Sequence, residues 1–501
     1  MLELMQMQTQ RNKNTINPDP RELLSGSTEL LLGFQSYEYL TKVTPDMDRF
    51  LTGYPLEAVY GPRNPQLDAI LDSADEIIGR ARGGSATPDF RAAEVYYVSG
   101  LADLVEGKSS PELVDTLIEA GKELYGQVNP RAIAWAGSQI RGSIEQLKGR
   151  VSDNSLSVML EELESGFEFT EKDGSVIRIP SVEDVFGKEG DSAEISLPYL
   201  STESREKLVG LFERELEPSL RFIDEYLDSS DITPPYSPDD IVDIFQRAIN
   251  AQLPDREDQI TAVIKEGESA ISWSSDGAAI NVGSKRISIK TKEALKGVFM
   301  HEFGVHALRY INGKSLGNDQ LASGLFMYDE DSDSSNVSYL DFEEGLASLI
   351  QKVVSGEELF SLKNMGYHVI ANMADKGYGF REIHEFMVRF RAVQSLKDKG
   401  PDATLTEKGM GIHSRNSFKQ LIRMFRGTPM NKTLNGSNGE VFYYPKDLTY
   451  ANGIIQVIGF MEDHGEQSLK YMLSSGKIDP TNPAHLKFLE TVLNQRSQTG
   501  A

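Results

Sequence analysis

Hydrophobic positions in the first part of the chain recur at the spacing of α-helices, with short breaks that contain glycine or proline. Between about 21–150 this pattern predicts helices, for example over 92–105 and 110–125, with a break at 126–130. Residues 150–230 are rich in acidic side chains and have no single hydrophobic period. A proline-rich segment at 228–240 is typical of a linker ahead of another helix. We therefore expect a helical N-terminal region.

The hydrophobic period changes after a helix predicted at 241–251. Three short, β-branched segments then have the pattern of strands, and the Gly-Ser pair at 283–284 is typical of a hairpin turn between the last two. These segments span 262–265, 278–282 and 286–290. Thr291 can cap the helix that follows, and the Asn-Gly pair at 312–313 can end it. The predicted fold is α+β and mainly helical, with a small antiparallel sheet next to this helix.

The pattern divides the chain into a mobile polar arm over 1–20, a helical region over 21–230 and a third region over 231–501. With 39% hydrophobic and 25% charged residues among 501, the composition is that of a soluble globular protein. No apolar run approaches the roughly 18 residues of a membrane span, and the polar start lacks the apolar core of a secretory signal. We expect a cytoplasmic protein with no membrane partner, and the absence of cysteine excludes thiolate ligands.

The formal net charge of −25 opposes general nucleic-acid binding, because phosphate contacts need a basic field. One stretch reverses the sign, since no acidic residue lies between Glu407 and Glu440. Four of its basic residues fall within an arc of about 80° on one predicted helix, beside an apolar stripe; they are Arg415, Lys419, Arg423 and Arg426. This helix offers either a basic binding edge or an ordinary solvated face.

The segment 301–306 (His-Glu-Phe-Gly-Val-His) places two imidazoles around a carboxylate on a predicted helix. Zinc takes neutral imidazole and carboxylate ligands at about 2 Å. The common motif spaces its histidines by four residues, whereas five residues put them about 140° apart around a regular α-helix. A one-residue π-bulge returns them to one face, and Gly304 permits such a distortion. The alternative is that His301 and His306 are ordinary core or surface histidines.

Glu343 and Glu344 open the next predicted helix, which runs to about residue 354, ahead of the small and apolar residues 345–347 that permit close helix packing. Adjacent acids on an apolar helix are costly to bury unless a cation neutralises them, as a zinc ion would. Alternatively, they only favour the helix N-terminus electrostatically. One of these acids completes a three-ligand zinc site, with Glu302 beside it as a candidate general base.

Several motifs in order along residues 90–465 resemble the microtubule-associated tyrosine carboxypeptidases and their bacterial relatives. The site also looks similar to that of dipeptidyl peptidase III, which has the same histidine spacing and a Glu-Glu pair. The motifs that carry the resemblance are Glu123-Leu124-Tyr125-Gly126, the segment from His301 to Gly313, Glu343-Glu344-Gly345-Leu346-Ala347, Arg423-Met424-Phe425-Arg426-Gly427 and the segment from Phe442 to Tyr450.

The resemblance implies a zinc peptidase with one Zn²⁺ per chain, and in the eukaryotic members a carboxypeptidase that removes a C-terminal tyrosine. By position, the implied ligands are His301, His306 and Glu344. Glu302 is the implied general base, which would activate a metal-bound water. Glu344 is preferred as ligand because bacterial relatives often carry glutamine at the first position of the pair. Glu343 is then expected to orient one of the imidazoles without binding the metal itself.

A carboxypeptidase needs a cation that binds the terminal carboxylate of its substrate. Arginine suits bidentate capture better than lysine, so Arg423 and Arg426 are the first candidates, followed by Arg415 and Lys446. Tyr450 is a candidate to stabilise the oxyanion, although a tyrosine in such a run is more often a packing residue. The expected partner is the C-terminus of a peptide or protein.

One segment differs from the pattern of the family that the chain resembles, and this difference bears on the expected substrate. An acidic loop at 329–335 is longer than expected and would repel an acidic tail such as that of tubulin, unless it is a mobile lid or a plain surface insertion. The alternatives to a carboxypeptidase are an endopeptidase with the same site and a non-catalytic protein that keeps the fold. The expected core is zinc-peptidase-like, with 231–501 as the catalytic region.

Overall fold

The computed structural model describes most of the chain, namely residues 34, 36–80, 90–148, 154–188, 196–254, 260–274, 278–327, 338–399, 404–430, 434–465, 468 and 471–499. This part is mainly helical, as predicted, and contains small sheets of two and three strands. No helix within these ranges is long and apolar enough to cross a membrane. The arm predicted at 1–20 and the acidic loop predicted at 329–335 lie outside the described residues.

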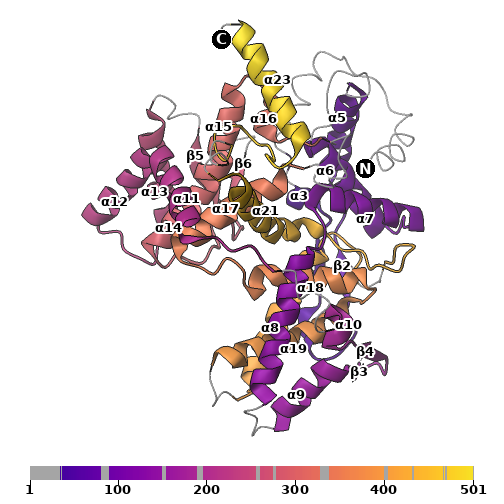
Figure 1. Ribbon diagram of the computed structural model, residues 1–501. Coiled ribbons are helices and arrows are strands. Elements are labelled where there is room, and N and C mark those ends of the chain that lie inside the picture. The colour runs from indigo at the N-terminus through magenta and orange to yellow at the C-terminus, as the bar shows by residue number, and fades with distance from the viewer. Residues whose placement is uncertain are drawn as a thin grey trace.

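Three groups of helices extend in different directions from a common centre (Figure 1). The first group has a core rich in aromatic side chains and comprises α3 (Ser36–Tyr39), α5 (Gln66–Arg80), α6 (Phe90–Val105) and α7 (Pro111–Tyr125). The second comprises α4 (Met47–Leu51), α8 (Pro130–Lys148), α9 (Asn154–Ser165), α10 (Val182–Phe186), α18 (Leu362–Asp375), α19 (Phe380–Asp398) and α20 (Glu407–Met424). Its two-stranded antiparallel sheet pairs β3 (Phe167–Thr170) with β4 (Val176–Ile179), and a similar sheet pairs β1 (Val43–Pro45) with β2 (Ala58–Tyr60).

The third group surrounds the largest hydrophobic core and carries the histidine segment. It comprises α11 (Thr202–Glu215), α12 (Glu217–Ser229), α13 (Pro238–Gln252), α14 (Lys292–Phe299), a π-helix η3 (Met300–Ala307), α15 (Leu308–Ser315), α17 (Leu340–Ser355) and α21 (Thr449–His464). The remaining elements lie at its border, namely α16 (Asp319–Ser323), the 3₁₀ helix η4 (Pro445–Leu448) and α23 (Pro483–Thr499).

Two glycines let α17 and α21 cross at the centre of the molecule (Figure 1). A Cβ atom on Gly345 would lie only 2.0 Å from the carbonyl carbon of Gly453, so neither helix accepts a side chain there. The prediction that small residues after the Glu-Glu pair permit close helix packing is therefore confirmed. This contact fixes the start of α17, which carries Glu343 and Glu344.

The sheet beside the histidine helix is mixed, whereas we predicted an antiparallel one. Its strands lie in the order β5 (Thr261–Lys265), β7 (Ala279–Gly283), β6 (Ile271–Ser274), with β5 parallel and β6 antiparallel to β7. The hairpin predicted at 283–284 is wrong, because β7 ends there and pairs with the preceding strand. Lys285 N–H donates to the Glu268 carbonyl, which turns the chain out of the sheet, and Ile289 then forms only an isolated bridge with Tyr236.

The elements α14, η3 and α15 follow one another as one continuous helical segment. Its start is as predicted, since Thr291 Oγ1 accepts a hydrogen bond from Ala294 N–H at 3.1 Å. Its end is three residues later than predicted, because Asn312 donates its side-chain amide to the Leu473 carbonyl and Gly313 packs against the Leu321 carbonyl. The left-handed turn falls instead at Gly317, with φ of +73°.

Candidate metal centre

The π-helical turn η3 brings the two histidines together, as the five-residue spacing predicted. The imidazole centroids of His301 and His306 are 5.0 Å apart, with the ring planes at 71°. One possible ligand atom from each of His301, Glu302 and His306 lies within 4.8 Å of the others. A regular α-helix would point the rings in divergent directions, so the wider turn creates this cluster.

Close packing behind the turn explains why Gly304 stands between the histidines. A Cβ atom on Gly304 would approach Leu216 Cδ1 to 2.9 Å and the Phe212 ring to 3.3 Å. The face of η3 opposite the imidazoles is thus pressed against the junction of α11 and α12. Gly304 therefore also serves helix packing, a role that the sequence pattern did not indicate.

Glu344 is the fifth residue of α17, and its carboxylate lies near the histidines. Its Oε2 atom lies 3.9 Å from His306 Nε2, and both side chains line the same cavity. Two ligands of one tetrahedral zinc ion, each at about 2.0 Å, are about 3.3 Å apart. The observed separation is somewhat longer, so Glu344 is a candidate ligand next to His306, beside the group of His301, Glu302 and His306 whose imidazole and carboxylate atoms could hold a metal ion.

Glu343 lies next to Glu344 but is almost fully buried, with 1% of its side chain exposed. Its Oε1 atom is 3.0 Å from His306 Nδ1, which is the contact that the predicted orienting role requires. Arg309 Nη1 donates to its other oxygen at 2.8 Å, and Lys477 Nζ donates to Oε1 at 2.7 Å. With the proton of His306 on Nδ1, the lone pair of Nε2 faces Glu344.

Glu302 is buried beside His301, and its Oε2 atom accepts the backbone N–H of Trp273 on β6 at 2.8 Å. Burial raises the pKa of Glu302 to about 7, and the charge of Glu344 adds to this effect, while His306, the Trp273 amide and Arg286 oppose it. A cation between the imidazoles would also oppose it. A carboxyl group with a pKa in this range can both accept and return a proton near neutral pH.

The pKa values of the two imidazoles are shifted in opposite directions. Burial, reinforced by the neighbouring His306, lowers the pKa of His301 to about 3, so this ring is neutral and free to act as a ligand. Burial also acts to lower the pKa of His306, but the hydrogen bond to Glu343 and the charge of Glu344 outweigh it, and the pKa is raised. The ring that carries a carboxylate on each side is thus the one that attracts positive charge.

A cavity of about 870 Å³ opens in front of this cluster. One wall is the edge strand β6, through residues 270–273, and the opposite side comes from helices α17 and α20. Residues 40–43 and 90–91 of the N-terminal region also line it, so the cavity draws on both sides of the boundary predicted at 230/231. The cations that face it are Lys42, Arg91, Lys265, Arg423, Arg426, Lys446 and Lys477.

Most, but not all, of the predicted substrate-binding residues line this cavity. Arg423, Arg426, Lys446 and Tyr450 line the cavity, but Arg415 is exposed on α20 and is not among the lining residues. The three cations also have internal acidic partners that the sequence did not reveal. Both arginines bind the fully buried carboxylate of Asp447, and Lys446 Nζ lies 3.0 Å from Glu94 Oε1. Half of the Arg423 side chain remains exposed to the cavity region.

Sequence reasoning missed the residues that support the cluster from behind. Arg309 lies three residues after His306, one helical turn away, and this spacing could have identified it. Lys477 is 134 residues from Glu343, and the Trp273 contact uses a backbone amide, so neither leaves a local signal. Comparisons with protein-family models, with curated proteins and with solved structures find no match for this chain.

Proposed function

We propose that the protein is a zinc-dependent metallopeptidase, and specifically a carboxypeptidase. The observation that supports this proposal is the cluster of His301, Glu302 and His306 on a π-helical turn, with Glu344 3.9 Å from His306. The cluster lies in a cavity large enough for several residues of a peptide. The motif resemblance to tyrosine carboxypeptidases points to the same class. In this proposal His301, His306 and Glu344 hold one Zn²⁺.

The chemistry divides between the ion and Glu302. Zinc at this position would lower the pKa of a bound water to about 7 and polarise the scissile carbonyl. Glu302 is held through Oε2 by the Trp273 amide, which leaves Oε1, 3.9 Å from His301 Nε2, to accept the proton of the attacking water. The same carboxyl group then donates that proton to the leaving amine, and it ends the cycle ionised.

The edge strand β6 supplies a surface for the peptide backbone. Among the residues that the structure describes, β6 pairs on one side only, in the order β5-β7-β6, and residues 270–273 line the cavity. An extended peptide that pairs with this free edge would pass the Trp273 amide and hence Glu302. Tyr450, which lines the same cavity, is the candidate donor to the developing oxyanion.

The decisive test replaces Glu302 by glutamine. Glu302→Gln keeps the side-chain volume and both imidazoles, so we expect zinc to bind with the wild-type stoichiometry. Turnover of peptide substrates should fall by about 10²-fold or more, because the proton acceptor is lost. Elemental analysis of the purified protein measures the zinc content. A mass-spectrometric assay of a peptide library, with and without a chelator, measures turnover. A variant with wild-type turnover would exclude Glu302 as the base.

An endopeptidase is the second candidate, and one observation favours it. Arg423 and Arg426 already bind Asp447, so the cations predicted to hold a terminal carboxylate have an internal partner. The peptide-library assay separates the candidates. Loss of single C-terminal residues supports the carboxypeptidase, whereas cleavage at internal bonds without preference for a free C-terminus supports the endopeptidase.

A further inference from the structure

A buried set of charges lies directly behind His306. Glu343 contacts His306 Nδ1 through Oε1, and the same oxygen accepts a hydrogen bond from Lys477 Nζ at 2.7 Å. Arg309 binds the other carboxylate oxygen at 2.8 Å. The exposed fractions are 0% for Arg309, 1% for Glu343 and 7% for the Lys477 side chain. Water therefore screens these interactions little, and loss of one partner leaves a charge without its full compensation.

The backbone around Lys477 is fixed as firmly as its side chain. Lys477 N–H donates to the Leu321 carbonyl at 2.7 Å, and its own carbonyl accepts from Leu325 N–H at 3.1 Å. The carbonyls on either side, at Gly476 and Ile478, both accept from the guanidinium of Arg309. Segment 476–478, which we call the strap, is thus held at three successive residues, and it presents Lys477 to Glu343 in one position.

The strap determines which way the carboxylate of Glu343 can turn. Arg309 alone could hold Glu343 in more than one rotamer, since it contacts only Oε2. Lys477 contacts Oε1, the atom that faces His306 Nδ1, and so fixes this oxygen next to the imidazole. A ring held at Nδ1 directs Nε2 toward Glu344 and the cavity.

We propose that Lys477 is a positioning residue of the metal centre, which holds His306 in its ligand orientation through Glu343. The inference rests on the metal site of the proposed function, but not on peptidase activity. Loss of an outer-sphere partner of a ligating histidine typically weakens metal binding by about 10- to 100-fold. We expect a weakening of this size when Lys477 loses its charge.

The experiment measures zinc affinity of the full chain by competition with a chromogenic chelator. Lys477→Met removes the charge but keeps the length of the side chain, and Lys477→Gln keeps a hydrogen-bond donor without charge. Lys477→Arg keeps the charge and should bind zinc more tightly than either. Lys352→Met is the matched control, since Lys352 lies on α17 like Glu343 but bonds the Glu358 carbonyl at the far end of the helix. Thermal melting of the zinc-free proteins verifies folding.

The expected result is about 10- to 100-fold weaker zinc binding in Lys477→Met and Lys477→Gln, with wild-type affinity in the control. Wild-type affinity in both Lys477 variants would overturn the positioning role and leave the proposed peptidase intact. Weaker binding in a protein that cleaves no peptide would support the positioning role while the proposed function fails. A wild-type chain that binds no zinc would overturn both.

Discussion

At the scale of single residues, several cations around the cavity already have acidic partners within the protein. Asp447 is fully buried and binds Arg423 and Arg426 together, so this group carries a net charge of +1. Arg423 uses one Nη atom in that contact and is half exposed. Its remaining N–H groups are therefore the most accessible donors in this group for a substrate carboxylate.

We therefore expect Arg423→Gln to act on the terminal carboxylate alone. The KM for peptides with a free C-terminus should rise about tenfold or more, because a charge-assisted hydrogen bond is lost, while the KM for amidated peptides stays unchanged. Steady-state kinetics on matched free and amidated peptides measure the difference. Lys408→Gln, an exposed change on the first turn of the same helix, is the control. Equal changes for both peptide classes would exclude this role for Arg423.

The residues that could be predicted are those whose signal is local in the sequence. The histidine spacing implied a wider helical turn, and the structure has it at Met300–Ala307. Thr291 could be predicted as a helix cap for the same reason, because its hydrogen bond from Ala294 N–H spans only three residues. Asp447 and Lys477 could not be predicted as partners, because their contacts depend on how distant segments pack.

At the scale of elements, the π-helical turn η3 depends on a glycine at its rear face. Its i→i+5 pattern is less favourable than a regular helix, so packing from outside has to stabilise it. Phe212 and Leu216 supply that packing, and both lie within 3.3 Å of where a Cβ atom on Gly304 would be. The shape of the metal centre is therefore coupled to the junction of α11 and α12.

Gly304→Ala tests this coupling. The added methyl group overlaps Leu216, so we expect the free energy of unfolding to fall by about 1 to 3 kcal/mol. Zinc affinity should fall as well, because η3 has to shift away from α11. Gly210→Ala on α11 is the control, since nothing lies within 4 Å of its Cβ position. There alanine should stabilise the helix by up to about 1 kcal/mol. Urea denaturation measures the free energy of unfolding of both variants. An equal gain in stability in both would exclude the packing role of Gly304.

The sheet shows why pairing of strands was harder to predict than the helices. The glycine at 283 is a real turn signal, but the turn leads out of the sheet instead of into a second strand. Instead, β7 lies between two strands that precede it in the chain. It pairs with β6 in antiparallel orientation and with β5 in parallel orientation. Local composition identifies where a strand ends, whereas the choice of neighbour depends on long-range packing.

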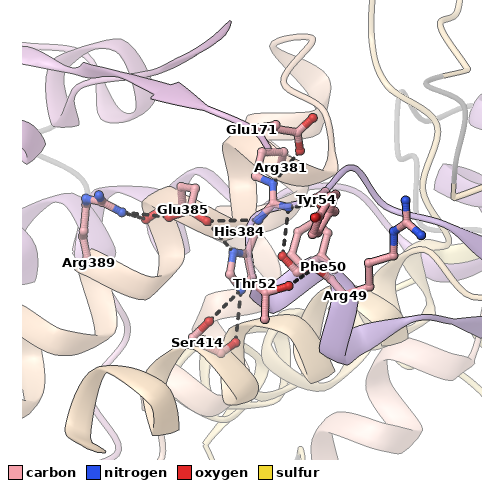
Figure 2. Close-up of polar contacts among 10 residues, drawn as sticks. All are labelled: Arg49, Phe50, Thr52, Tyr54, Glu171, Arg381, His384, Glu385, Arg389 and Ser414. Atoms are coloured by element: carbon pink, nitrogen blue, oxygen red, sulfur yellow. Dashed lines mark hydrogen bonds and ion pairs between the residues drawn. The ribbon is translucent and has the colours of Figure 1, made fainter. Parts of the chain in front are cut away.

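At the scale of the whole molecule, a buried polar network within the second helical group joins α4 and the residues after it to α19, which is more than 300 residues away in the chain (Figure 2). Arg381 on α19 is its centre, and its guanidinium lies 3.5 Å from the Phe50 ring centroid. It donates to Glu171 Oε1 at 2.9 Å and to the backbone carbonyls of Phe50 and Tyr54. Residues 40–43, which line the cavity, lie a few residues before this segment in the chain.

Arg381→Met removes the centre of this network and leaves the Glu171 carboxylate, which is only 7% exposed, without its cation. We expect the free energy of unfolding at pH 7 to fall by about 3 to 5 kcal/mol, as for other broken buried ion pairs. Arg49→Met is the control from the same region. Its pair with Glu57 is 46% and 59% exposed, so its loss should cost about 1 kcal/mol or less. Urea denaturation of both variants gives the comparison.

The effect of Arg381→Met should also depend on pH, through Glu385. Burial acts to raise the pKa of Glu385, but a hydrogen bond to His384 and the charges of His384, Arg389 and Arg381 outweigh it and lower the pKa from 4.5 to about 2. A folded-state pKa below the unfolded value gives stability that is present above pH 4.5 and is lost as the pH falls toward 2. Arg381 is one of the charges that keep Glu385 ionised in the folded state, so the difference between wild type and Arg381→Met should shrink as the pH falls from 5 to 2. A difference that is the same at both pH values would mean that Arg381 acts only through packing, and not through the buried carboxylates.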